Sequence, residues 1–178
     1  MKATGIVRRI DDLGRVVIPK EIRRTLRMRE GDPLEIFTAA DGEIIFKKYS
    51  PIGEFSEFAA QYTEVLSRAT GMTVMITDRD HVISVSGSQK RALADGRVSA
   101  ELERLMDERG SFTAKSGIGI KPVMNSELEA SVAYTIIGSG DVSGSVVMMF
   151  DAQKAPPDST KEKLVSVAAS FLGKQTEE

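Results

Sequence analysis

The chain of 178 residues is long enough for one medium domain or two small ones, and its charge is divided unevenly. Residues 1–50 carry 11 Lys and Arg against 8 Asp and Glu, whereas residues 51–178 carry 13 against 18. The basic first part suits a polyanionic partner, and the acidic remainder would repel one. The chain has no cysteine and one histidine, which excludes disulfides, thiolate chemistry and Cys/His metal sites.

Targeting and membrane segments are not predicted. Met1 is not followed by an apolar signal-peptide region, and no stretch approaches the ~18 consecutive apolar residues that a membrane span needs. We therefore expect a soluble cytoplasmic protein that holds neither a metal nor a cofactor.

The first fifty residues, here called the head, are predicted to form short strands around one short helix. Residues 4–10 are rich in β-branched side chains, and residues 15–18 form a second β-type run after the turn cluster 11–14. Pro19 is favoured at a first helical position, and residues 20–27 follow without a breaker. The pattern predicts two strands followed by a helix of about two turns.

A hairpin is predicted to complete the head. Residues 34–38 and 43–47 are strand-like, and they are joined by residues 39–42, which end in the strong turn dipeptide Asp-Gly. Residues 51–55 then form a linker to the rest of the chain, residues 56–178, here called the body.

The body is predicted to be an α+β domain. It opens with a helix whose apolar side chains share one face and which ends before Gly71. The members of this stripe are Phe55, Phe58, Ala59, Tyr62, Val65, Leu66 and Ala69. Such a stripe normally packs into a core or a helix bundle, and seldom lines a ligand pocket. A strand pair, residues 72–77 and 82–86, and a helix around residues 98–106 follow.

The rest of the body alternates strands with a final helix. Residues 118–123, 131–137 and 143–150 are β-rich, and residues 138–141 form the last hairpin turn. Ser159 and Glu162 have the spacing of a capping box at the start of the last helix. The apolar side chains that this helix is expected to bury are Leu164, Ala168, Phe171 and Leu172.

The helix of the head carries an unusual cluster of cations. Its basic residues occupy positions i, i+3, i+4 and i+7, which lie on one helical face: Lys20, Arg23, Arg24 and Arg27. Like charges at these spacings weaken a helix by a few tenths of a kcal/mol per pair, so structure alone would favour interspersed acids. The alternative is an ordinary solvated face. Further arginines on the neighbouring strands, Arg8, Arg9 and Arg15, favour nucleic acid as the partner.

The head is also predicted to require a second chain. Its apolar side chains are too few to offset the conformational entropy lost when about fifty residues become ordered. Because no disulfide or metal can add stability, a homodimer that shares one core is the simplest solution. Two-fold symmetry would also duplicate the basic face, so that both copies reach successive stretches of duplex.

These residues identify a family. The runs Thr4–Asp11, Leu13–Arg24 and Gly31–Ile36 resemble the AbrB family of transition-state regulators over nearly all of the head. The run Gly-Arg-Val-Val-Ile-Pro-Lys, with its flanking Arg pair and Gly-Asp turn in register, makes the resemblance specific. The chain as a whole resembles the longer, sporulation-type members of that family.

The resemblance implies a swapped-hairpin dimer that binds double-stranded promoter DNA, with shape and flexibility read more than a strict base code. The DNA-facing arginines of the family fall on Arg8, Arg15, Arg23 and Arg24, and Lys20 is a secondary candidate. Arg27 fits the helical face but lies outside the family motif. Strand alternation does not decide whether Arg8 or Arg9 faces the DNA.

The body resembles a GAF domain in its order of helices and strands. That resemblance implies either a small-molecule site beside the sheet or association through the terminal helices, which would join two dimers into a tetramer. The chain has no cysteine to attach a bilin and no clear cyclic-nucleotide motif, so the identity of a ligand stays open.

An enzyme is not expected, because candidate catalytic groups are few. His81 lies in a predicted polar turn with no second His or Cys. Gly117-Ile118-Gly119 and Gly138-Ser139-Gly140 lack a following helix and indicate turns more than phosphate sites. Two carboxylate pairs, Asp78 with Asp80 and Glu127 with Glu129, have the composition of cation ligands but are typical of solvated loops.

We therefore expect a DNA-binding regulator of sporulation-stage genes, acting as an activator, a repressor or both. One alternative is an antitoxin of the same fold, which would use a disordered acidic tail where this chain has a patterned domain. The other is a small-molecule-binding or catalytic body, with the head serving only to form oligomers.

Overall fold

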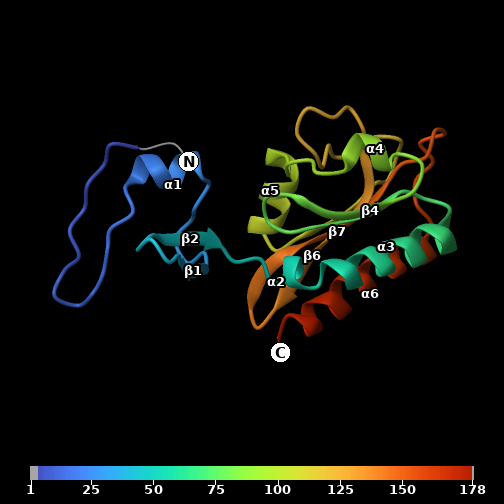
Figure 1. Cartoon of the computed structure of the whole chain (residues 1–178). Helices are drawn as coiled ribbons and strands as arrows, with labels where there is room; N and C mark the ends of the chain where they lie inside the picture. The colour runs from blue at the N-terminus through green and yellow to red at the C-terminus, as the bar shows by residue number, and fades with distance from the viewer. Residues whose placement is uncertain (1–3, 178) are drawn as a thin grey trace. The chain divides into compact units, whose positions relative to one another are not determined.

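The computed structural model describes residues 4–177, and the predicted domain ends at residues 1 and 178 lie outside them. The chain divides into two compact units, Met1–Tyr49 and Ser50–Glu178 (Figure 1). The boundary lies at the start of the predicted linker, and from here on the head and the body are these two units. Each unit has its own secondary structure and is described by itself.

The head contains one helix and one hairpin. Helix α1 spans Lys20–Thr25, and strands β1 (Leu34–Thr38) and β2 (Ile44–Lys48) pair antiparallel. The connecting turn contains Gly42 at a φ of +87°, a conformation that glycine adopts without steric cost. The predicted hairpin is therefore confirmed, with its second strand shifted by one residue.

The two strands predicted at the start of the head are not formed in the single chain. Residues 5–11 and 15–19 have no regular secondary structure, although Asp11 and Arg15 close the turn between them through a backbone hydrogen bond of 3.0 Å. A strand exists only where another strand satisfies its N–H and C=O groups. Among residues 4–177 of the single chain these segments have no such neighbour, so the prediction is wrong for one chain alone.

Helix α1 is shorter than predicted. Pro19 is its N-cap and not its first helical residue, and Leu26 is its C-cap. Arg27 follows in the left-handed region at a φ of +51°, which ends the helix two residues before the predicted boundary.

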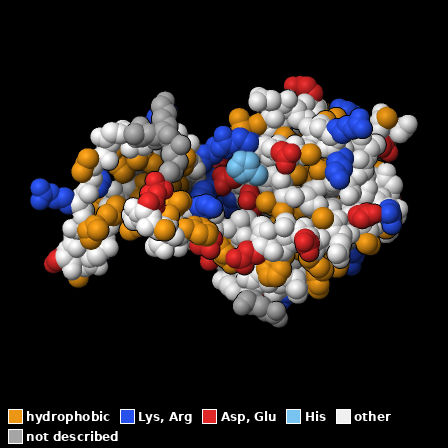
Figure 2. Space-filling model, in the orientation of Figure 1, with side chains coloured by type: hydrophobic (Ala, Val, Ile, Leu, Met, Phe, Trp, Pro, Cys, Tyr) orange, Lys and Arg blue, Asp and Glu red, His pale blue; other side chains and the backbone are white. Residues whose placement is uncertain are grey.

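The head leaves its apolar side chains open to solvent. Among its described residues only Pro19 is buried, and both hydrophobic cores of the chain are built from body residues. Figure 2 shows hydrophobic side chains spread over the surface of this unit, at the left of the view. The exposed members are Ile6, Val7, Ile10, Leu13, Val16, Val17, Leu26, Ile36, Phe37, Ile44, Phe46 and Tyr49.

The body is built on a five-stranded antiparallel sheet in the order β4-β3-β7-β6-β5. Its strands are β3 (Val74–Thr77), β4 (Val82–Ser86), β5 (Ser111–Thr113), β6 (Ala130–Gly138) and β7 (Asp141–Met149). The hairpins predicted at residues 78–81 and 138–141 are both present.

Helices cover both faces of this sheet. The bounds are α2 (Pro51–Glu54), α3 (Ser56–Thr70), α4 (Lys90–Leu93), α5 (Ala100–Asp107) and α6 (Ser159–Gln175). Helices α3 and α6 lie side by side on one face, and α4 and α5 lie on the other (Figure 1). Among residues 4–177, no helix combines the length and the apolar character that crossing a membrane requires.

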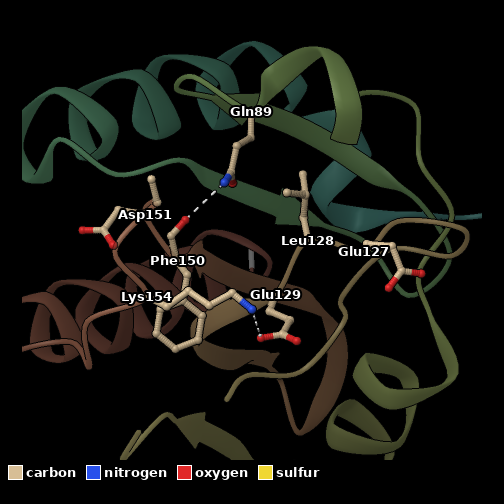
Figure 3. A pocket seen from close by; sticks show the side chains of 8 residues that line it. Gln89, Glu127, Leu128, Glu129, Phe150, Asp151 and Lys154 are labelled. Carbon is tan, nitrogen blue, oxygen red and sulfur yellow. Dashed lines mark hydrogen bonds and ion pairs between the residues drawn. The ribbon is translucent and has the colours of Figure 1, made fainter. Parts of the chain in front are cut away.

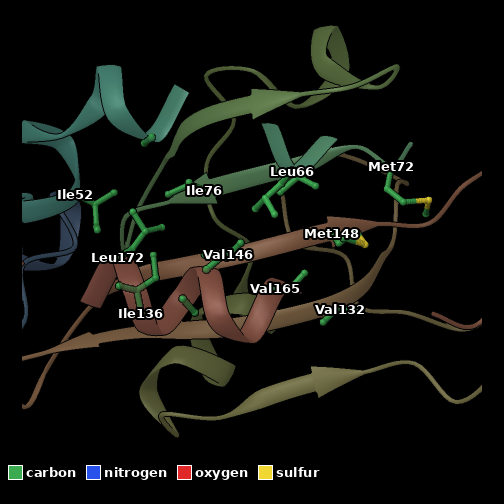
Figure 4. Packing of buried hydrophobic residues seen from close by; sticks show 14 residues of the cluster. Ile52, Leu66, Met72, Ile76, Val132, Ile136, Val146, Met148, Val165 and Leu172 are labelled. Carbon is green, nitrogen blue, oxygen red and sulfur yellow. The ribbon is translucent and has the colours of Figure 1, made fainter. Parts of the chain in front are cut away.

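Alternation along the strands fills two cores. On β7, Val146 and Met148 pack toward α3 and α6, whereas Val147 and Met149 pack toward α5. Figure 4 shows the first core between α6 and the sheet. Because both faces are covered, residues 146–149 of β7 form a continuous buried apolar run, which explains why this half of the strand lacks polar alternation.

Three segments of the body differ from the predictions. Residues 118–123, predicted as a strand, form only isolated bridges at Ile120 and Val123, whereas the three-residue strand β5 was not predicted. Part of the predicted linker is helix α2, and its Ile52 is 1% exposed in the core of the body. A buried apolar anchor of this kind cannot be recognised from four residues with a helix-initiating proline.

The start and outer face of α6 also differ. Its N-cap is Asp158, whose carboxylate accepts a hydrogen bond of 2.8 Å from the Lys161 amide. Glu162 does not complete a capping box, because its carboxylate accepts hydrogen bonds from Thr113 and Tyr134. Phe171, predicted to be buried, is 41% exposed.

The apolar stripe of α3 is divided between two environments. Ala59 and Leu66 are buried against the sheet, whereas Val65 and Ala69 are exposed. The helix ends at Gly71, as predicted, in the left-handed conformation at a φ of +69°. One edge of the stripe therefore belongs to the core, and the other forms a surface.

Candidate nucleic-acid interface

Helix α1 presents three of the four predicted cations on its surface. Lys20, Arg23 and Arg24 are exposed, and none of them has an ion pair or side-chain hydrogen bond within residues 4–177. Arg23 and Arg24 lie in the last turn, where the helix carbonyls favour positive charge. These three side chains are free to bind an anion.

Arg27 does not belong to this surface as predicted. It is half-buried and follows the helix, so it no longer continues the i, i+3, i+4 row. Its backbone carbonyl accepts a hydrogen bond of 3.0 Å from Lys48 Nζ, which joins the end of α1 to β2. Because α1 ends at Thr25, Arg27 lies beyond the helical face on which it was predicted.

Arg8 and Arg9 lie in the extended segment before the first turn, and both are exposed. The segment has no strand partner in the described part of the single chain, so pleating does not assign one arginine to each face. Whether Arg8 or Arg9 faces the DNA therefore stays a question for experiment.

Arg15 lies at the end of the turn and is held by Asp11. The Asp11 carboxylate accepts hydrogen bonds from the Leu13 amide at 3.0 Å, the Arg15 amide at 2.8 Å and Arg15 Nε at 2.8 Å. These hydrogen bonds lower the pKa of Asp11, and the one from the Arg15 backbone amide has the largest effect. Sequence reasoning missed Asp11, although a carboxylate four residues before an arginine and flanking a Leu-Gly turn is the available signal.

The body holds a small cavity at one end of the sheet (Figure 3). Its volume is about 200 Å³, and its walls come from the loop after β4, the loop before β6 and the segment after β7. The lining residues are Gln89, Glu127, Leu128, Glu129, Phe150, Asp151, Ala152 and Lys154.

Two polar groups of this cavity are fixed. Gln89 Nε2 donates a hydrogen bond of 3.2 Å to the Phe150 carbonyl, which orients the amide and leaves Oε1 buried with no hydrogen-bond partner within residues 4–177. The Glu129 carboxylate accepts hydrogen bonds from Lys154 Nζ at 3.0 Å and from the Gly119 amide, and the Lys154 hydrogen bond in particular lowers the pKa of Glu129. Glu129 is therefore a carboxylate at neutral pH.

The residues considered for catalysis or metal binding lie in a hydrogen-bonded turn or in a surface ion pair. His81 is exposed in the turn after β3, and Asp78 accepts hydrogen bonds from the Asp80 and His81 amides. Glu127 pairs with Lys121. Among residues 4–177, no group of three or more His, Asp or Glu side chains is arranged to hold a metal.

The second Gly-x-Gly fragment, residues 138–140, is the β6–β7 turn, as predicted. In the first, a Cβ on Gly119 would lie 2.2 Å from the Ala130 carbonyl oxygen, so that glycine is required for backbone packing.

Comparison with known families identifies the body. A family described as the C-terminal part of stage V sporulation protein T, a transcription factor, matches residues 54–177, which is more than half of the chain. The chain belongs to this family. A second family, described as the antidote-toxin recognition protein MazE, a bacterial antitoxin, matches residues 7–54.

Individual relatives agree with this assignment. Stage V sporulation protein T of Bacillus subtilis (strain 168) is 48% identical over 180 residues, covering all of both chains. The transition state regulatory protein AbrB of the same organism is 63% identical over 51 residues, which are 29% of this chain and 52% of AbrB. The predicted resemblance of the head to the AbrB family is confirmed. The chain is therefore a DNA-binding transcription regulator of the sporulation type.

The GAF-like fold of the body is also confirmed. The GAF domain of an Acinetobacter phosphoenolpyruvate-protein phosphotransferase superposes with a TM-score of 0.52 at 9% identity. The alignment covers 73% of this chain and 84% of that domain. At this identity the likeness concerns the fold alone, and a ligand has to be argued from the residues of this chain.

Proposed function

We propose that two heads interleave into a dimer that binds double-stranded promoter DNA through Arg8, Arg15, Lys20, Arg23 and Arg24. The carrying observation is that these cations are exposed on a unit whose apolar side chains are exposed as well. A second head would bury the apolar side chains, since exposing so many is unusual for a stable unit. The same association would provide strand partners for residues 4–10 and 15–18.

The dependence of DNA affinity on salt tests this proposal. For each phosphate contacted, the logarithm of affinity falls with the logarithm of salt concentration at a slope of roughly 0.9. We expect Arg23→Ala with Arg24→Ala to reduce the slope by about two and to weaken binding uniformly across sequences. The exposed Arg91 of the acidic body is the matched control, and its replacement by Ala should change neither quantity. An unchanged slope in the double variant would contradict the proposed interface.

We further propose that the body joins two head dimers into a tetramer through α3 and α6. Phe58 and Tyr62 of α3 each place their ring centroid 5.8 Å from that of Phe171 on α6. One turn after Tyr62 on α3 and one turn before Phe171 on α6, Val65 and Val167 are 62% and 54% exposed. An apolar surface shared by two helices is typical of a helix-bundle interface.

A second candidate function of the body is small-molecule sensing, favoured by the cavity at Gln89. A buried acceptor without a partner is costly, and a ligand N–H or O–H would satisfy it. Ligand pockets usually enclose roughly 300–1,000 Å³, so a cavity of about 200 Å³ admits only a small metabolite.

Thermal unfolding with a panel of small metabolites that carry N–H or O–H donors tests this candidate. A ligand at 100 times its dissociation constant adds about 2.7 kcal/mol to the free energy of unfolding. We expect Gln89→Met to abolish the shift produced by an active compound and Gln153→Met, just outside the lining, to retain it. A panel without any shift would favour a structural role for the body.

We infer that the protein regulates transcription and has no enzymatic activity, because its family is one of transcription factors. It would act in the cytoplasm, where promoter DNA is accessible, as an activator or a repressor according to the promoter. The antitoxin alternative is disfavoured because the match to stage V sporulation protein T extends over the whole chain.

A further inference from the structure

The turn at residues 11–15 is organised around one carboxylate. Asp11 Oδ1 accepts hydrogen bonds from two backbone amides, those of Leu13 and Arg15, while Oδ2 accepts from Arg15 Nε at 2.8 Å. The backbone of Asp11 adds a donor to the Arg15 carbonyl and an acceptor for the Gly14 amide, each at 3.0 Å. Oδ1 of Asp11 therefore accepts the hydrogen bonds that stabilise the turn, whereas Oδ2 holds the guanidinium of Arg15.

This ion pair is not explained by stability. The Arg15 side chain is 69% exposed and that of Asp11 38% exposed. Exposed ion pairs of this kind contribute little to folding, because water and salt screen them. An acidic residue is also unfavourable close to a DNA backbone, since it repels phosphate. A carboxylate at this place in a basic DNA-binding head therefore requires another reason.

The geometry supplies that reason. A guanidinium has five N–H donors, and Asp11 uses the one on Nε. The four donors on the two terminal nitrogens remain, and their fork is the arrangement that binds a phosphate or a guanine edge with two parallel hydrogen bonds. Holding the side chain in one rotamer before binding reduces the conformational entropy that DNA binding has to remove.

We propose that Asp11 is a positioning residue for DNA binding, which holds Arg15 through Nε and leaves its terminal nitrogens directed to a phosphate or a base edge. The proposal rests on the proposed function, because it requires Arg15 to bind DNA. If Asp11 has this role, removing its negative charge from the DNA-binding unit weakens DNA binding, although electrostatics alone would strengthen it.

Asp11→Asn is the informative variant. An asparagine keeps an oxygen for the Leu13 and Arg15 amides, as in an Asx turn, but replaces the oxygen that holds Nε by an amide donor. Asp12→Asn is the matched control, because it makes the same charge change one residue away at an exposed carboxylate with no side-chain partner among residues 4–177. We expect Asp11→Asn to weaken promoter affinity about two- to ten-fold, the range of ordering one long side chain, and Asp12→Asn to leave it equal or tighter.

A double-variant cycle in the full-length protein separates positioning from electrostatics. If Asp11 acts through Arg15, Asp11→Asn should lose its weakening effect in an Arg15→Ala background and resemble Asp12→Asn there. Tighter binding by Asp11→Asn in the wild-type background would overturn the proposal, and so would equal weakening in both backgrounds. If Arg15→Ala itself leaves affinity and salt slope unchanged, the proposed function of Arg15 fails instead.

A spectroscopic readout on the unmodified protein covers the case in which Asp11→Asn does not fold. The Arg15 Nε–Hε group should give a resolved NMR signal that exchanges slowly with water, because its proton is hydrogen-bonded to Asp11. We expect this signal to be absent or rapidly exchanging in folded Asp11→Asn and unchanged in Asp12→Asn. A rapidly exchanging Arg15 signal in the unmodified free protein would overturn the proposal.

Discussion

At the scale of single residues, ion pairing decides which cations are available to bind phosphate. The cations proposed to bind DNA have no acidic partner within residues 4–177, with the exception of Arg15, which Asp11 holds. Several cations of the body form ion pairs, as Lys121 does with Glu127 and Lys154 with Glu129. Free cations are available to phosphate, whereas paired cations would have to exchange one anion for another.

Arg8 and Arg9 offer a test at this scale, because they are adjacent, equally charged and both exposed. In a paired strand, successive side chains point to opposite faces, so only one of the two can face the DNA. We expect Arg8→Ala to lower the salt slope of DNA binding by about one and Arg9→Ala to leave it nearly unchanged. Equal reductions would show that this segment does not bind DNA as a pleated strand.

At the scale of secondary-structure elements, the sequence pattern predicted hairpins correctly where both strands lie in the same chain. The hairpin of β1 with β2 was predicted from an Asp-Gly turn and that of β6 with β7 from the turn residues 138–141, and both are present. The segment 118–123 has the composition of a strand but forms only isolated bridges. Composition does not show that a side chain on Gly119 would collide with the Ala130 carbonyl oxygen, since that contact is set by a segment eleven residues away.

The absent strands of the head lead to a prediction for hydrogen exchange in the full-length protein. If a second chain pairs with residues 4–10 and 15–18, their backbone amides should exchange slowly, like those of β6, whereas the turn at residues 39–42 exchanges quickly. Protection should decrease on dilution below the dimer dissociation constant. Rapid exchange of both segments in a dimeric sample would contradict an interleaved head.

The contact of α6 with β6 leads to a prediction for stability. A Cβ on Gly173 would lie 2.1 Å from the Ile137 carbonyl oxygen, so that helix and strand approach too closely for any side chain. Gly→Ala within a helix usually stabilises by roughly 0.5–1 kcal/mol, but here we expect destabilisation of about 1–3 kcal/mol from overpacking. Chemical denaturation measures the change, with Ser170→Ala on the exposed side of α6 as the control. A more stable Gly173→Ala variant would refute this packing argument.

At the scale of the whole molecule, the two units differ in how they satisfy their apolar side chains. The body buries two cores within one chain, whereas the head buries only Pro19 among its described residues. We therefore expect the head to depend on association more than the body does. The surface shared by α3 and α6 is the feature of the body that favours a further level of assembly.

Val65→Glu tests that assembly. The side chain is 62% exposed, so the substitution should leave the thermal stability of the body nearly unchanged, while a buried glutamate would be costly in a helix-bundle interface. We expect tetramers to become dimers, as measured by light scattering coupled to size-exclusion chromatography. Ala60→Glu, which adds the same charge on another exposed side of α3, should remain tetrameric. A tetrameric Val65→Glu variant would place the interface elsewhere.

The sequence by itself determined the charge division, the family of the head, the α+β nature of the body and the basic residues of the candidate interface. These follow from composition, spacing and local turn chemistry, which require no knowledge of distant segments. Tertiary structure alone decided that Ile52 belongs to the core and that Phe171 and Val65 form a surface. Each of these depends on which neighbours a side chain contacts in three dimensions, and periodicity along the chain does not specify those contacts.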